Sequence, residues 1–365
     1  LATEQEDLRD LRVSLVEKRT GQFMVGGTFS SEDSLMGFVE LTQSNFDWRN
    51  WPSFRGGGQR MRMRAQIGTE YTNFLVSFTE PWWFDRRLRL DLDAFLTTRY
   101  EDSYDQTDTG LGMSVTRAWR TTWRQTFGLR IRHVSLDGFD DDLYAGTDSA
   151  LLLDMQENDE VFANRIIYSM ARDTRDRPTM LFPTSGSRIE FGGELITRAL
   201  GSYSDYYLLT AEGTKYYPVF KQSVLKLRGM VGLADEIAGD DIGVFDRFFA
   251  GGPGTIRGFD RREVGPVDDD WRENPMGGKT MAVGSVELIR PLASWAQVSV
   301  FSDFGNVWAD SFEISGGINA SVGIGLQLQL PVGPISLAYG FPVLTDQKHL
   351  SGNSGRLHFS IGTSF

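Results

Sequence analysis

Apolar and polar residues alternate with a period of two through most of this 365-residue sequence. In residues 59–65 arginines alternate with methionines, and in residues 87–94 the charged and aliphatic side chains alternate in the same way. Because successive side chains of a strand point to opposite faces, these segments predict strands with one polar and one apolar face. Several runs reach ten residues or more, the length that a tilted strand needs to cross a bilayer. The pattern therefore favours a transmembrane sheet over a soluble sandwich, whose strands are usually shorter, at about five to six residues.

Composition excludes several other classes of protein. No run of 18 apolar residues exists, so no transmembrane helix is expected. With 37 basic and 49 acidic residues the net charge is −12, which argues against nucleic acid as a partner. The absence of cysteine excludes disulfides and thiolate metal sites. We expect neither a metal nor any other cofactor.

The connections between the expected strands also alternate in character. Short ones contain proline or aromatic residues, and longer ones are acidic, as at residues 137–160 and 342–355. Short turns on one side and long loops on the other are typical of outer-membrane barrels. We therefore predict an all-β fold, a 16-stranded antiparallel transmembrane β-barrel over residues 21–365, with the long loops facing outward. The expected strands cover residues 22–30, 33–42, 58–68, 71–79, 86–100, 109–119, 123–136, 160–172, 186–198, 203–217, 221–234, 279–290, 295–306, 316–330, 332–340 and 355–365.

Nothing in the sequence indicates a catalytic centre. No Gly-x-Ser-x-Gly motif exists, and the histidines at 133, 349 and 358 are far apart in sequence. An outer-membrane hydrolase could pair one of them with a serine, but no such pair stands out. We therefore expect that the protein is not an enzyme.

One loop, residues 247–259, combines glycines and aromatic residues around a single arginine, Arg257. Phe249, Gly251 and Gly252 form its expected turn, and glycine allows the backbone to approach other atoms closely. A solvent-filled loop has no need of so many apolar side chains. We predict that this loop folds into the barrel lumen and places a charge there. The residues that form the motif around the arginine are Ile256, Arg257, Gly258 and Phe259.

Glu287 and Asp303 are isolated acids in the two nearly uncharged strands that follow this loop. A buried arginine needs such partners, because an unpaired buried charge is costly. From the residues alone two interpretations stay open. The acids pair with Arg257, or each simply lines a water-filled lumen.

The segment 247–259 resembles the inward loop of the BamA-type outer-membrane protein assembly factors, a branch of the BamA/TamA superfamily. Residues 303–308, with the pattern Asp-x-Gly-x-x-Trp, and several later strands resemble the same family in the same order. The resemblance implies that Glu287 and Asp303 hold the loop arginine on the barrel wall. It also implies that periplasmic POTRA domains precede the barrel, so residues 1–20 are expected to be the remnant of such a domain and a linker.

The resemblance further implies a function. We expect a bacterial outer-membrane protein that folds and inserts other β-barrel proteins. Its partners would be unfolded outer-membrane protein clients, outer-membrane lipid, periplasmic chaperones and accessory lipoproteins. A two-partner secretion transporter, or another protein-translocation pore of the same superfamily, is the alternative.

The two ends of the barrel sequence suggest how such a protein would work. Residues 357–365 alternate in the manner of a terminal assembly signal and stop at an aromatic residue. We predict a lateral seam between residues 22–30 and 357–365, weakened by glycine, which opens to accept a client strand. The glycines could instead serve packing. The expected seam residues are Gly26, Gly27, Phe359, Gly362 and Phe365.

Overall fold

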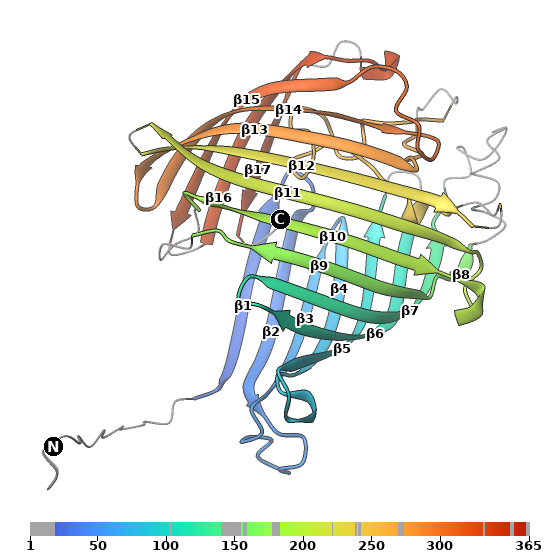
Figure 1. Ribbon diagram of the computed structural model, residues 1–365, viewed down its shortest axis with the longest axis vertical. Coiled ribbons are helices and arrows are strands. Elements are labelled where there is room, and N and C mark those ends of the chain that lie inside the picture. The colour runs from blue at the N-terminus through green and yellow to red at the C-terminus, as the bar shows by residue number, and fades with distance from the viewer. Residues whose placement is uncertain are drawn as a thin grey trace, which may run out of the picture.

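The computed structural model describes residues 19–101, 104–139, 155, 159–176, 183–220, 222–237, 239, 242–268, 274–330, 333–350 and 354–362. In these residues the chain is an all-β, closed antiparallel barrel with sixteen strand positions, which confirms the predicted fold class (Figure 1). Among them no helix is long and apolar enough to cross a membrane. Residues 1–18 and Phe365 lie outside this part of the chain, so the remnant domain and the terminal aromatic stay predictions.

Apart from β8 and β9, each strand pairs with its neighbours in sequence, and β1 closes on β17. The strands are β1 (Gly21–Ser30), β2 (Ser34–Phe46), β3 (Gln59–Gly68), β4 (Tyr71–Glu80), β5 (Leu88–Tyr100), β6 (Asp105–Trp119), β7 (Trp123–Asp137), β8 (Glu160–Phe162), β9 (Arg165–Asp173), β10 (Gly186–Ile196), β11 (Tyr206–Phe220), β12 (Ser223–Glu236), β13 (Thr280–Ala293), β14 (Ala296–Trp308), β15 (Asn319–Leu330), β16 (Gly333–Leu344) and β17 (Arg356–Ile361).

The strand expected over residues 160–172 is interrupted, which corrects the prediction of one continuous strand. β8 and β9 both pair with β7 and together occupy one position in the barrel. The break falls at Asn164, whose side-chain oxygen accepts a hydrogen bond from the Arg132 amide at 3.1 Å. A side chain thus takes the place of a backbone acceptor, and the strand resumes at Arg165.

The two faces of the wall differ as the alternation requires. In β13, Val283 and Glu287 point into the lumen and are buried, whereas Val286 and Leu288 point outward and are 40% and 41% exposed. The same division recurs around the barrel, so the apolar side chains that remain exposed form a belt on the outside. This surface suits contact with lipid, and the polar lumen suits contact with water or with a buried loop.

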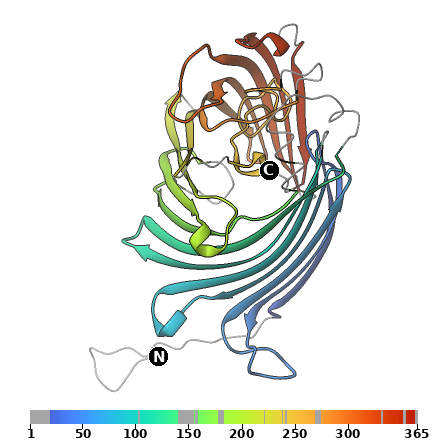
Figure 2. The same ribbon diagram turned by 90° about the vertical axis from the view of Figure 1, so that its right-hand side faces the viewer.

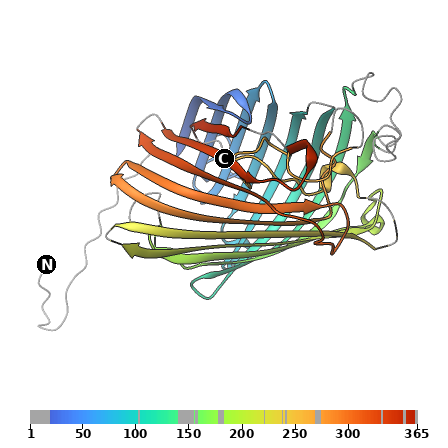
Figure 3. The same ribbon diagram turned by 90° about the horizontal axis from the view of Figure 1, so that it is seen from above.

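The two longest connections, residues 138–159 and 237–279, lie at one end of the barrel. The chain segments 138–159, 237–279, 309–318 and 345–355 connect strands at that end, opposite the start of β1 and the end of β17. The separation is incomplete, because residues 47–58 form a twelve-residue connection at the other end. The segment 242–268, yellow to orange in Figures 2 and 3, lies inside the ring of strands.

This topology predicts which connections face the cell exterior. The protein has no native cysteine, so a single cysteine is a specific label. We expect Glu313→Cys, in an exposed long loop, to react with a membrane-impermeant maleimide on intact cells. Ser53→Cys, exposed in the connection at the other end, is the matched control and should react only after the outer membrane is permeabilised. Labelling of Ser53→Cys but not of Glu313→Cys on intact cells would show that the barrel has the opposite orientation in the membrane.

Candidate functional site at the luminal loop and the barrel seam

Arg257 reaches from the luminal loop to the wall and makes its closest contacts with Asp303 of β14. The guanidinium donates from Nε to Asp303 Oδ2 at 2.7 Å and from Nη2 to Oδ1 at 2.9 Å. The Arg257 backbone N–H also donates to Asp303 Oδ2, at 3.1 Å. Two parallel charge-assisted bonds fix both the position and the orientation of the arginine. The Asp303 side chain is only 1% exposed, so this pair lies in the protein interior.

Glu287 of β13 is a second, more distant acid for the same arginine. Its Oε1 lies 3.4 Å from Arg257 Nη1, and its Oε2 lies 3.2 Å from Lys226 Nζ of β12. The Arg257 guanidinium carbon also lies 3.4 Å from the centre of the Phe301 ring, a cation–π contact. The structure therefore brings together the three residues that the sequence suggested, and it makes Asp303 the main partner.

The charges around Arg257 keep it ionised. Burial alone would lower the pKa of Arg257, but the hydrogen bonds and charge of Asp303, together with Glu287, raise it above its ordinary value. Two acids and two cations, Lys226 and Arg257, meet here. The Ser285 hydroxyl of β13 also donates to Asp303 Oδ1, at 2.6 Å, so the arrangement holds the loop on two strands.

Gly258 brings the loop into backbone contact with the next part of the wall. It has φ +95, and a Cβ atom at this position would lie 2.9 Å from the carbonyl carbon of Gly340 in β16. Any side chain here would have to displace the β16 backbone, and φ in this range favours glycine. Glycine at 258 and 340 thus allows the loop backbone to lie directly on the strand.

The Gly258 N–H donates to Nε2 of His358 in β17, at 3.0 Å. Because Nε2 accepts this bond, the ring proton of a neutral His358 is on Nδ1, which lies 3.5 Å from Glu32 Oε1 in the β1–β2 turn. The His358 side chain is 4% exposed. One imidazole therefore connects the luminal loop, the last strand and the turn that follows the first strand.

Asp246, at the start of the luminal loop, is held by a second buried network. Its carboxylate accepts from Arg132 of β7 at 2.7 Å and from Arg165 of β9 at 2.8 Å, and the Tyr206 hydroxyl of β11 also donates to it. Burial would raise the pKa of Asp246, but Arg165, Arg132 and the hydrogen bond from Tyr206 lower it to about 2. The loop is thus fixed to the wall at Asp246 as well as at Arg257 and Gly258.

The other residues of the loop motif pack into the lumen. Ile256 and Phe259 are fully buried in a cluster that includes Met281 and Val283 of β13. The turn residues serve local contacts: the Gly251 N–H donates to Thr255 Oγ1 at 2.8 Å. In the same turn a Cβ atom at Gly252 would lie 3.2 Å from Glu32 Oε2. Phe249 has the guanidinium of Arg262 above its ring, 3.9 Å from the centre.

Among the described residues, β1 and β17 share two residue pairs, far fewer than β1 shares with β2. Phe29 opposes Ile361 and Ser30 opposes Ser360, and the Ser31 N–H donates to the Phe359 carbonyl at 3.0 Å. By contrast, every residue of β1 opposes a residue of β2. Outside the barrel wall the Phe29 and Phe359 rings are in contact, with centroids 4.9 Å apart.

The described pairs lie within the predicted seam of residues 22–30 with 357–365. The same register places residues 364 and 363 opposite Gly26 and Gly27, and these lie outside the described residues, so the rest of the seam stays a prediction. A Cβ at Gly26 would lie 2.7 Å from the Phe38 ring of β2, so this glycine accommodates a neighbour within the sheet. β17 ends at Ile361, and Gly362 has φ +100, a turn away from the extended conformation.

Sequence reasoning did not identify His358 or Asp246 with its two arginines. His358 was one histidine among three, with no residue near it in sequence to mark it as a partner. Its inward position in the alternation of β17, between outward Leu357 and Phe359, was the only available indication. Asp246, Arg132 and Arg165 look like ordinary lumen-lining charges until the register of β7 and β9 places them together.

Comparison with known proteins agrees with the barrel fold. The Omp85 superfamily domain matches residues 53–365. The outer membrane protein assembly factors BamA of Nitratidesulfovibrio vulgaris and Neisseria meningitidis are 27% and 25% identical to the chain, over 100% and 98% of its length. The chain spans 44% and 49% of those two relatives. The crystal structure of BamA from Haemophilus ducreyi lacking POTRA domains 1–3 superposes with a TM-score of 0.79 at 22% identity, covering 94% of this chain and 70% of that one.

The fold and the family match together define a transmembrane β-barrel of the outer-membrane type. The chain belongs to the Omp85 superfamily. The barrel fold and the bacterial BamA relatives place it in the bacterial outer membrane.

We predict that Arg257 and Asp303 are energetically coupled. Arg257→Ala leaves Asp303 buried without its cation, which typically costs about 3–5 kcal/mol. The strand ladder is untouched, so the barrel should stay closed while the loop becomes sensitive to protease. Arg257→Lys should rescue only partly, because an ammonium has no fork of donors for a carboxylate.

A double-mutant cycle of Arg257→Ala with Asp303→Asn, read out by loop proteolysis, measures this coupling. The matched cycle with Glu287→Gln should give a smaller value, because Lys226 still neutralises that acid when Arg257 is absent. Zero coupling in both cycles would show that the arginine does not anchor the loop.

His358 offers a separate prediction for the loop's contact with the last strand. His358→Leu leaves the Gly258 N–H without its acceptor, which costs roughly 1–3 kcal/mol when a buried donor is left unpaired. We expect faster proteolysis of the loop and, in His358→Gln, partial recovery through the amide oxygen. Heat-modifiable migration in gels should confirm that both variants fold. Equal loop protection in His358→Leu and the unmodified protein would contradict this role.

Proposed function

We propose that this barrel folds and inserts other β-barrel proteins into the outer membrane, and that clients enter through a lateral seam between β1 and β17. The observation that carries this proposal is the short seam. The described pairs are confined to residues 29–30 and 360–361, while β1 extends from Gly21. The relatives named as outer membrane protein assembly factors support the same activity, but they are about twice as long as this chain.

The physical basis is the cost of unpaired backbone groups in lipid. Every backbone N–H and C=O in the hydrocarbon region needs a partner, and each unsatisfied group costs several kcal/mol. We propose that the part of β1 without a described partner on the β17 side is the edge that accepts an incoming strand. A client strand that pairs there gains the hydrogen bonds that it lacks, which is recognition by β-augmentation.

The loop gives the seam a defined resting position. His358 connects β17 to Gly258, and Arg257 next to it is tied to β13 and β14. Opening the seam by moving β17 would require breaking the bond between His358 and the loop, or moving both together. Clients, outer-membrane lipid, periplasmic chaperones and accessory lipoproteins are the partners that such an activity requires.

A disulfide across the seam tests the proposal. Ser30 and Ser360 oppose each other directly, and Ser→Cys is nearly isosteric, so the double variant Ser30→Cys/Ser360→Cys should oxidise without disturbing the fold. In the complete protein we expect the oxidised form to lose client insertion and to regain it after reduction. The control pair Thr116→Cys/Thr126→Cys bridges β6 and β7, which pair along fifteen residues, and should keep full activity in both forms.

The same experiment separates the alternative function. A protein-translocation pore carries its substrate through the lumen, so locking the seam should leave it active. Insertion that continues at the full rate in verified cross-linked protein would remove lateral opening from the mechanism.

A further inference from the structure

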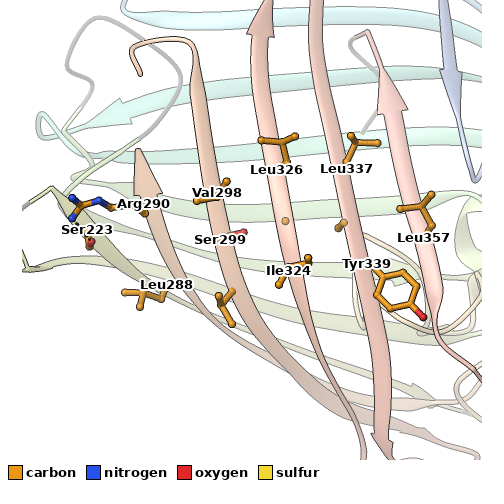
Figure 4. Close-up of a pocket in the computed structure, with 13 residues that line it drawn as sticks. Ser223, Leu288, Arg290, Val298, Ser299, Ile324, Leu326, Leu337, Tyr339 and Leu357 are labelled. Atoms are coloured by element: carbon orange, nitrogen blue, oxygen red, sulfur yellow. Dashed lines mark hydrogen bonds between the residues drawn. The ribbon is translucent and has the colours of Figure 1, made fainter. Parts of the chain in front are cut away.

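A groove of about 600 Å³ crosses the outer surface of the wall between β12 and β17. Its apolar lining comes from outward positions of five neighbouring strands, as Figure 4 shows. The outward direction follows from the alternation: Leu288 lies next to inward Glu287, and Leu357 lies next to inward His358. The apolar side chains that line it are Leu288, Val298, Val300, Ile324, Leu326, Leu337, Tyr339 and Leu357.

One end of the groove is polar. Arg290 of β13 lies there and donates to the Ser223 hydroxyl of β12, at 3.2 Å (Figure 4). Arg290 is the one charged side chain among the described residues that line the groove, and it is exposed. The groove therefore combines a long apolar floor with a cation at one end, which matches the division of a phospholipid into acyl chains and a phosphate headgroup.

The position of Arg290 along the strand supports this match. It lies three residues before the end of β13, and the next strand begins at Ala296. At about 3.3 Å per residue this places Arg290 within roughly 10 Å of the turn. Trp295, in that turn, is 51% exposed, as expected of an aromatic residue at the membrane–water boundary. An arginine on the lipid face costs little at this depth, whereas at the bilayer midplane it costs about 2–4 kcal/mol.

The two polar groups are also suited to bind one phosphate. A guanidinium presents a planar fork of donors that fits phosphate oxygens. The Ser223 hydroxyl accepts from Arg290 and has a proton of its own to donate. Both groups come from adjacent strands of the sheet, and the hydrogen bond between them holds them side by side.

We propose that this groove is a binding site for a single phospholipid, whose phosphate lies on Arg290 and Ser223 and whose acyl chain lies across β13 to β17. The site is on the wall that ends at the last strand, so a lipid held there would border the seam. The proposal does not depend on lateral opening or on the identity of the clients.

Native mass spectrometry of the folded barrel, released from detergent micelles, tests this site with phosphatidylglycerol as the probe. Removing one arginine near a phosphate should weaken binding about fivefold, since such a contact is worth about 1 kcal/mol. We therefore expect Arg290→Gln to lower the occupancy of phosphatidylglycerol by that factor. A diacylglycerol with the same chains but no phosphate should bind the unmodified barrel more weakly than phosphatidylglycerol.

Two further variants define the site. Lys215→Gln removes another outward cation, which lies 5.2 Å from the Tyr217 ring and outside the groove, and it should not change the occupancy. Val300→Trp fills the groove from a position that is 60% exposed and should lower the occupancy while the barrel stays folded. Unchanged binding in Arg290→Gln or in Val300→Trp, or an equal loss in Lys215→Gln, would overturn the proposal.

Discussion

The pairing of backbone hydrogen bonds in lipid is the constraint on which this structure depends. A sheet in the hydrocarbon region must close on itself, because an open edge leaves N–H and C=O groups without partners. In the described residues this closure consists of residues 29–30 of β1 opposite residues 360–361 of β17. Pairings elsewhere in the wall extend much further, as between β11 and β12 or β6 and β7.

The luminal loop connects that weak place to the rest of the barrel. Asp246 is bound by arginines of β7 and β9, Arg257 by acids of β13 and β14, and Gly258 by His358 of β17. Each of these contacts is buried, and each would leave a costly unpaired group if one partner were removed. The loop therefore joins separate parts of the wall through the lumen, and the residue that contacts the last strand, Gly258, directly follows Arg257.

The sequence predicted the features that depend on local pattern. The alternation gave sixteen strand positions, and the isolated charges at 257, 287 and 303 marked side chains that the structure brings together. It could not predict features that depend on how distant strands pair. The interruption at Asn164 comes from a side chain that replaces a backbone acceptor. The extent of the seam depends on the register between the first and last strands and on the turn at Gly362, which no pattern within either strand specifies.

Hydrogen–deuterium exchange of the barrel in lipid nanodiscs tests the central claim, that β1 carries an unpaired edge, most directly. About half of the amides of a strand point to each neighbour, so a strand with one neighbour protects only half of them. The account predicts that about half of the amides of residues 22–28 exchange rapidly, while those of β4, which pairs with β3 and β5, stay protected. Protection of residues 22–28 equal to that of β4 would show that the seam is fully paired and would contradict the account.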